Sequence, residues 1–216
     1  MTKRNKAPPT WRRLLPAVDS VTIVGLGGIG RQVAVQLAAL GVPRLQLVDA
    51  RTVSRSNHAA EGYPFEDVGR LLVHAAAQQG HQINPQLHVD SITRRSLKAV
   101  DLGDAVLCCP GSLSVWRAVG RQAHDSSAVA CCDVIGGTIR VGFARGATSL
   151  PEVLGKTTPP ETARRSARRS TVPVHVATVA AGLLVVEFIR FAAGDQAWRA
   201  VRFDLQSLRA DIKEPR

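Results

Sequence analysis

The sequence predicts an α/β protein with a doubly wound, mainly parallel Rossmann-like sheet and antiparallel strands added at its C-terminal end. Three observations predict this fold. Short apolar runs alternate with segments of helical spacing, a glycine-rich turn follows the first run, and an acidic residue closes the second. The 216 residues, 45% of them hydrophobic and 21% charged, fit one globular domain and exclude a disordered chain.

The start of the folded chain predicts one parallel crossover unit. Val21–Val24 is a short apolar strand, and Gly30–Leu40 has apolar residues at helical spacing until Gly41 ends the helix. Leu45–Val48 predicts a second strand, which Asp49 closes. Strand, glycine turn, helix and strand follow one another within about 30 residues, the length expected of such a unit.

The later segments continue this alternation and set the domain limits. The predicted helices are Val68–Gln79, Leu113–His124 and His175–Phe191, and the predicted strands are Leu87–Ile92, Ala105–Cys109, Ala128–Cys132, Thr138–Ala144 and Val201–Leu205. Residues 1–17 predict a flexible basic arm, and residues at about 145–171, with repeated Arg-Arg-Ser, a mobile basic crossover loop. The apolar stretch 172–193 contains charged residues, so we expect a buried helix and not a membrane span.

The glycine turn is the first candidate site. It reads Gly25-Leu-Gly-Gly-Ile-Gly30 and follows a strand, so its backbone can approach a phosphate while the next helix offers free N–H groups. Asp49 ends the second strand, where a carboxylate can accept hydrogen bonds from ribose hydroxyls. We predict a nucleotide site. Its members are Gly25, Gly27, Gly28, Ile29, Gly30 and Asp49. Geometry alone does not separate ATP from NAD.

Further motifs narrow the nucleotide class. Leu47-Val-Asp49 and Ser56-Asn57 follow the turn, and the later matches are Glu66-Asp-Val-Gly69, Ile83-Asn-Pro85 and Val201-Arg-Phe-Asp204. Together with the turn they resemble the ThiF/MoeB/HesA family, the bacterial relatives of ubiquitin-activating enzymes. The resemblance implies that residues 18–216 form a single ThiF-like nucleotide-binding domain, and it adds Asn57 to the site.

The resemblance also implies a chemistry and partners. Such proteins use ATP with Mg²⁺ to adenylate the C-terminus of a ubiquitin-like or sulfur-carrier protein, and they form a homodimer or a heterodimer with a paralogue. The family's zinc-binding CxxC pairs are missing, so we expect no zinc. Cys108-Cys109 and Cys131-Cys132 are instead expected to be buried apolar residues in a cytoplasmic protein.

Several catalytic positions of that family are changed in this chain. The substitutions are Ala60 and Glu61 for an Arg-Gln pair, Leu72 for a Lys, Gly111 for the Mg²⁺-binding Asp and Arg51 for the second Asp of an acidic pair. Each lost electrostatic partner can cost ~10²–10³ in rate. The sequence therefore leaves open whether the chain adenylates its partner or is a degenerate pseudoenzyme that only binds it. Arg31 and Arg51 are hypothesised to supply replacement charge.

Two other function classes stay open at this point. A dinucleotide-dependent oxidoreductase would use Asp49 to bind NAD, although no Tyr-Lys or His-Asp proton relay follows the turn. A non-catalytic interaction or scaffold subunit would use the formal charge of +11 to bind an acidic partner. Nucleic acid is not expected, because no aromatic platform accompanies the arginines.

Overall fold

The computed structural model of the chain describes residues 18–56, 58–94, 97–110, 112–145, 172–195 and 199–213. The predicted arm 1–17 lies outside the described residues. So does the predicted crossover loop, except for Arg145, which ends a strand. The mobility predicted for these two segments therefore stays a prediction.

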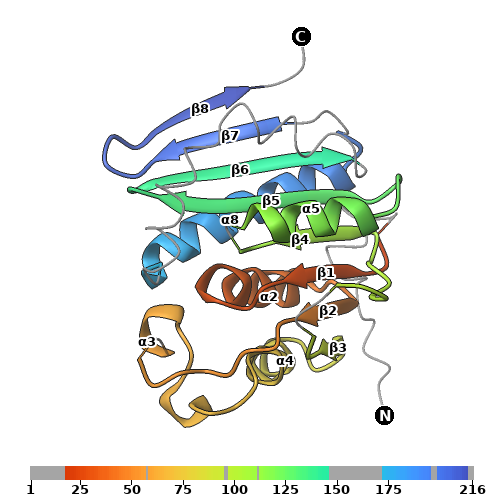
Figure 1. The fold of residues 1–216 in the computed structure, drawn as a ribbon, viewed down its shortest axis with the longest axis vertical. Coiled ribbons are helices and arrows are strands. Elements are labelled where there is room, and N and C mark those ends of the chain that lie inside the picture. Colours follow the sequence, from red (N-terminus) through yellow and green to blue (C-terminus); the bar gives the residue numbers. More distant parts are fainter. Residues whose placement is uncertain are drawn as a thin grey trace, which may run out of the picture.

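The described residues form an eight-stranded sheet in the order β3-β2-β1-β4-β5-β6-β7-β8 (Figure 1). The strands are β1 (Val21–Val24), β2 (Arg44–Val48), β3 (His88–Ile92), β4 (Ala105–Cys108), β5 (Ala128–Ile135), β6 (Thr138–Arg145), β7 (Arg199–Asp204) and β8 (Arg209–Lys213). The strands from β3 to β5 in this order are parallel, and those from β5 to β8 are antiparallel. The predicted fold class is confirmed.

Helices cover both faces of the sheet. They are α2 (Gly28–Leu40), α3 (His58–Glu61), α4 (Leu72–Ile83), α5 (Leu113–Gln122) and α8 (Val174–Ala192), with a 3₁₀ turn η1 (Phe65–Asp67). The larger core lies between one face and α2, α4 and α8, and the smaller core between the other face, α5 and residues 97–102 (Figure 1). This two-sided covering explains why the central parallel strands β1 and β4 are buried along their whole length.

The helix α8 is the one described helix that is long and apolar enough to cross a membrane by length and composition. Its inner side packs against α2, β5 and β6, and Ala177, Leu184 and Phe188 are fully buried there. Glu187 is also buried, with Arg190 Nη1 at 3.2 Å from its Oε2. These contacts are those of a core helix, as the sequence predicted.

Some element boundaries differ from the prediction. The helix predicted from Val68 begins at Leu72, because Gly69 has a φ of +93° and Leu71 forms a β-bridge with Thr52. β5 and β6 extend to a two-residue turn of glycines with positive φ, which is the turn that fits a twisted hairpin. β8 was missed, since its exposed, charged residues carry no apolar pattern.

Candidate functional site

The glycine turn joins β1 to α2 at the point where the strand order reverses between β1 and β4. Gly25 has a φ of +83°, and its N–H donates to the carbonyl of Val48 at 2.8 Å. A Cβ on Gly30 would lie 1.8 Å from the carbonyl oxygen of Gly25. The helix thus approaches the strand as closely as two backbones can, and open α/β sheets bind ligands at this switch point.

The first turn of α2 presents backbone donors beside the glycine turn. Gly27 is its N-cap and offers no side chain, and no acid lies within the first helical turn. The N–H groups and the dipole at this end of the helix favour an anion. Ile29 is 6% exposed and its side chain belongs to the core, so only its backbone can serve a ligand.

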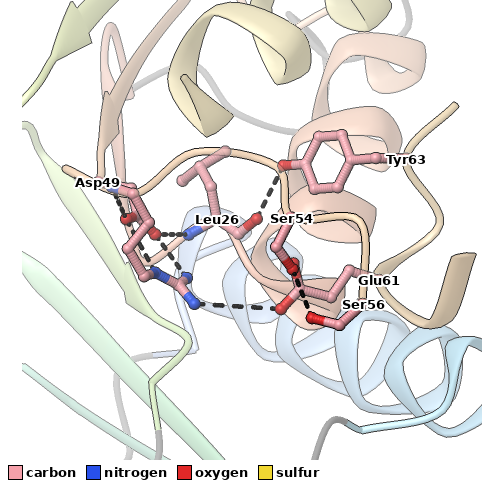
Figure 2. Close-up of polar contacts among 7 residues, drawn as sticks. Leu26, Asp49, Ser54, Ser56, Glu61 and Tyr63 are labelled. Atoms are coloured by element: carbon pink, nitrogen blue, oxygen red, sulfur yellow. Dashed lines mark hydrogen bonds and ion pairs between the residues drawn. The ribbon is translucent and has the colours of Figure 1, made fainter. Parts of the chain in front are cut away.

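Asp49 lies next to the turn, at the carboxyl end of β2. The Leu26 N–H donates to its Oδ2 at 2.8 Å (Figure 2). Arg51 donates to the same carboxylate through Nη2 to Oδ2 at 2.7 Å and Nε to Oδ1 at 3.1 Å. Burial by itself would raise the pKa of Asp49, but the hydrogen bonds and charge of Arg51, with the Leu26 N–H, lower it. Asp49 is therefore ionised, and both of its oxygens are engaged by the protein.

Glu61 reaches the same turn from α3. Its buried carboxylate has Oε1 at 4.0 Å from Nη1 of Arg51 (Figure 2). A Cβ on Gly27 would lie 3.4 Å from Oε1 of Glu61 and 3.6 Å from Nη2 of Arg51. A buried carboxylate and a partly exposed guanidinium thus lie directly against the second glycine of the turn.

Tyr63 ties the α3 segment to the turn. Its buried hydroxyl donates to the carbonyl of Leu26 at 2.7 Å (Figure 2). Burial raises the pKa of Tyr63 well above its ordinary value, so the hydroxyl remains a donor. The guanidinium carbon of Arg31 lies 5.6 Å from the centre of the Tyr63 ring, and a Cβ on Gly62 would lie 2.7 Å from Nη1 of Arg31. Arg31 therefore packs beside this segment, and burial lowers its pKa.

Most of the predicted site residues come together. Those at the turn are Gly25, Gly27, Gly28, Ile29, Gly30, Asp49 and Arg51. Arg31 lies to one side, against Tyr63, and Asn57 lies outside the described residues. Tyr63 was not among the predicted residues, and its only signal in the sequence is that the chain has a single tyrosine. Glu61 was predicted only as a change from the family pattern.

Apart from Arg51, the altered family positions supply no cation to the turn in the described part of the chain. Leu72 is 1% exposed and belongs to the core, and Ala60 carries only a methyl group. Arg70 donates through Nη1 to Asp67 and to Gln78, each at 2.6 Å, and so is directed elsewhere. Gly111 lies outside the described residues.

Metal and thiol chemistry find little support among the described residues. No group of three or more His, Cys, Asp or Glu is arranged there to hold a metal ion. The four cysteines are buried, as predicted, and none forms a disulfide. Cys108 lies opposite Cys131 in the register of the neighbouring strands β4 and β5. Burial raises the pKa of Cys109 and of Cys131 well above the ordinary thiol value. Thiols in such surroundings are inert rather than nucleophilic.

Comparison with known sequences connects this site to one family. Residues 12–216 match the model of the ThiF family. The sulfur carrier protein ThiS adenylyltransferase of Escherichia coli is 32% identical over 131 residues, 58% of this chain and 50% of that protein. The molybdopterin-synthase adenylyltransferase of Haemophilus influenzae is 30% identical over 112 residues, 49% of this chain and 46% of that protein. The matched part of the chain thus spans about half the length of these relatives.

Comparison with solved structures supports the fold. The structure of Escherichia coli MccB with ATP superposes with a TM-score of 0.73 over 94% of this chain and 65% of MccB, at 16% identity. The structure of MccB with AMPCPP and MccA gives a TM-score of 0.75 over the same shares of the two chains, also at 16% identity. At this level of identity the likeness shows the shared architecture alone.

Proposed function

Because the chain belongs to the ThiF family, we propose that it binds an adenine nucleotide where β1, β2 and β4 end. The observation that carries the proposal is the glycine turn with the buried, ionised Asp49 beside it at the switch point of the sheet. ThiF-family adenylyltransferases use ATP, which favours an adenine nucleotide over NAD. The backbone of the turn would hold phosphate, and Asp49 would accept from a ribose hydroxyl.

The donor set fits a nucleotide better than it fits a metal ion. Gly27 leaves a space that a Cβ would fill, so a ligand can approach the backbone there. The first turn of α2, which has no side-chain cap, follows directly. Among the described residues, Asp49 binds the guanidinium group of Arg51, and Asp133 accepts from Nε of Arg140 at 2.8 Å. Carboxylates paired with a cation in this way are poor ligands for Mg²⁺, although a remaining lone pair of Asp49 can still accept from a hydroxyl. No step of the proposed function therefore goes through Mg²⁺.

We further propose that the chain binds its partner's C-terminus but adenylates it poorly or not at all. Adenylation needs cations at the phosphates and an acceptor carboxylate in line with the α-phosphate. Ala60 and the buried Leu72 supply no charge at their positions, and Arg51 is committed to Asp49. By analogy with the named relatives, the partner would be a ubiquitin-like or sulfur-carrier protein.

The proposal also covers the oligomeric state and the cellular compartment of the protein. We propose that the chain works as a homodimer or paired with a paralogue. Four free, buried thiols are consistent with a reducing compartment such as the cytoplasm.

Calorimetric titration with adenosine, AMP, ATP and NAD tests the nucleotide site. We expect heat from adenine nucleotides with the wild-type chain. Asp49→Asn is expected to weaken adenosine binding by about tenfold, because a charged acceptor becomes neutral and one of its two oxygens is replaced by a donor. The matched control is Asp90→Asn, which removes a carboxylate that pairs with Arg44 at 2.7 Å on the far side of β2. Equal weakening by both substitutions, or binding of NAD alone, would contradict the proposal.

Exchange of ³²P between pyrophosphate and ATP tests the missing adenylation. The full chain is incubated with candidate carrier proteins that end in a free carboxylate. We expect no exchange above the rate without carrier, and a carrier-dependent exchange would show that the chain is an active adenylyltransferase.

A further inference from the structure

Two arginines near the glycine turn are bound to carboxylates, but Arg31 is not. Arg51 donates to Asp49 through two of its nitrogens. Arg70 donates to Asp67 at 2.6 Å. The side chain of Arg31 has no carboxylate partner within the described part of the chain, and its Nε is buried without a hydrogen bond. Arg31 is therefore a cation beside the turn whose charge no acid takes up.

Arg31 lies on the face of α2 that begins with the second glycine of the turn. Gly27 and Arg31 are four residues apart, and the Arg31 N–H donates to the carbonyl of Gly27 at 2.9 Å. Residues at this spacing lie one above the other, about 6 Å apart along the helix axis, and helical side chains point back toward the N-terminal end. The side chain of Arg31 therefore extends toward the turn at which the proposed site would hold phosphate.

Tyr63 orients the guanidinium group of Arg31 without neutralising it. The guanidinium carbon lies 5.6 Å from the centre of the Tyr63 ring. The ring itself is fixed, because its hydroxyl donates to the carbonyl of Leu26, in the turn, at 2.7 Å. An aromatic face attracts a guanidinium group and orients its plane, but it carries no charge that would neutralise the cation. Arg31 is thus held in place with its charge available to an anion.

The surroundings of Arg31 make an unpaired charge there costly. A Cβ on Gly62 would lie 2.7 Å from Nη1 of Arg31 and 3.3 Å from Cγ2 of Val174, so the guanidinium group lies close to backbone and apolar groups. Burial lowers the pKa of Arg31, which nevertheless stays charged at neutral pH. A partly buried cation gains more from an anion than an exposed cation does, because less water screens the pair. Binding of an anionic ligand would offset a cost that the unliganded protein bears.

We infer that Arg31 is the side chain that binds a phosphate of the nucleotide at this turn. Its guanidinium group would donate to a phosphate that the first backbone N–H groups of α2 also hold. The inference rests on the proposed adenine-nucleotide site and specifies which side chain recognises the phosphates. Arg51, by contrast, positions Asp49. One arginine does not replace the cations missing at Ala60 and Leu72, so Arg31 supports binding without restoring adenylation.

Calorimetric titration of the full chain with adenosine, ADP and ATP tests the inference. Arg31→Ala should weaken the binding of ADP and ATP by at least about tenfold, because a charge-assisted hydrogen bond to phosphate is lost, while adenosine binding stays within about twofold. Arg31→Lys keeps the charge and loses the planar fork, so its affinity for ATP should fall between those of the wild-type chain and Arg31→Ala. The matched control is Arg121→Ala, which removes the same charge from an exposed position of α5 on the other face of the sheet and should change nothing.

The possible outcomes separate this inference from the proposed function. Unchanged ATP binding in Arg31→Ala would overturn the inference and leave the nucleotide site intact. An equal loss for adenosine and ATP in Arg31→Ala would show that Arg31 only supports the packing around Tyr63, and equal effects of Arg31→Ala and Arg121→Ala would show an effect of net charge alone; either result overturns the inference. If no adenine compound binds to the wild-type chain, the proposed function fails. Titration with pyrophosphate then decides the role of Arg31, since equal binding by the wild-type chain and Arg31→Ala, or none, would overturn it as well.

Discussion

The close approach of α2 to β1 predicts that Gly30→Ala destabilises the protein strongly. The added Cβ would lie 1.8 Å from the carbonyl oxygen and 2.9 Å from the carbonyl carbon of Gly25, and 3.4 Å from Cβ of Cys109. Contacts of Cβ atoms below 3.0 Å essentially do not occur, so the helix and the turn must separate by more than an ångström. Overpacking costs typically ~1–3 kcal/mol. Because the obstructing group is backbone and not a flexible side chain, we expect about 3 kcal/mol or more.

Urea unfolding and thermal unfolding of the wild-type chain and of Gly30→Ala measure this cost. For a domain of this size, ~3 kcal/mol corresponds to a fall in Tm of about 6–12 °C. The matched control is Gly182→Ala in the middle of α8, where a Cβ would have nothing within 4 Å. Alanine there should stabilise the protein by ~0.5–1 kcal/mol, because glycine costs entropy inside a helix. A loss below about 1 kcal/mol in Gly30→Ala would refute the packing explanation.

Three further predictions follow from buried ionisable groups. Tyr63 is the only tyrosine, and since burial raises its pKa, tyrosinate absorbance should appear only when alkali unfolds the chain; a smooth titration near the ordinary tyrosine pKa would contradict its burial. In Arg51→Ala, the carboxyl pKa of Asp49, followed by carbon NMR, should rise, because the folded state loses the partner that lowers it. In the wild-type chain this pair stabilises the fold above the unfolded pKa of Asp49, and that stability is lost on acidification, whereas the variant does not have it to lose. An unchanged pKa in the variant would disprove the pairing. Burial raises the pKa of Glu187, so its contribution favours folding at low pH and declines as the pH rises from the unfolded pKa through the folded pKa. Glu187→Gln should flatten the urea-measured stability as the pH rises above the ordinary glutamate pKa of ~4.3, and an identical slope in both proteins would count against this cause.

The sequence was sufficient for the parallel half of the fold because its strands are buried on both faces. Val21–Val24 and Ala105–Cys108 are wholly buried, so their apolar runs carry a clear signal. Gly41 ends α2 in a left-handed conformation, as its position after the last apolar helical residue predicted. β8 could not be predicted in this way, since all five of its residues are exposed and only its pairing with β7 makes it a strand.

The site was predictable only to the level of its backbone. The glycine turn and Asp49 follow from sequence spacing, because each lies at the end of a strand whose place in the sheet is fixed. The hydrogen bonds from Arg51 to Asp49 depend on the backbone conformation where β2 passes into the following loop, and no sequence pattern specifies that conformation. The position of Glu61 over Gly27 depends on tertiary contacts of Tyr63 with Leu26, 37 residues apart, and these have no local signal.

The arrangement at the turn separates the retention of a nucleotide site from the retention of catalysis. The features that would bind an adenine nucleotide in the proposed site are backbone geometry and one buried carboxylate, and the 1.8 Å approach at Gly30 shows how closely packing constrains that backbone. The family positions whose changes argue against adenylation include Ala60 and Glu61, which lie in the segment between β2 and α4 and outside the apolar core. Arg51 lies in the same segment, and two of its guanidinium nitrogens are taken by Asp49. Substitution in this segment can therefore remove charges that adenylation needs while the packed turn keeps its shape.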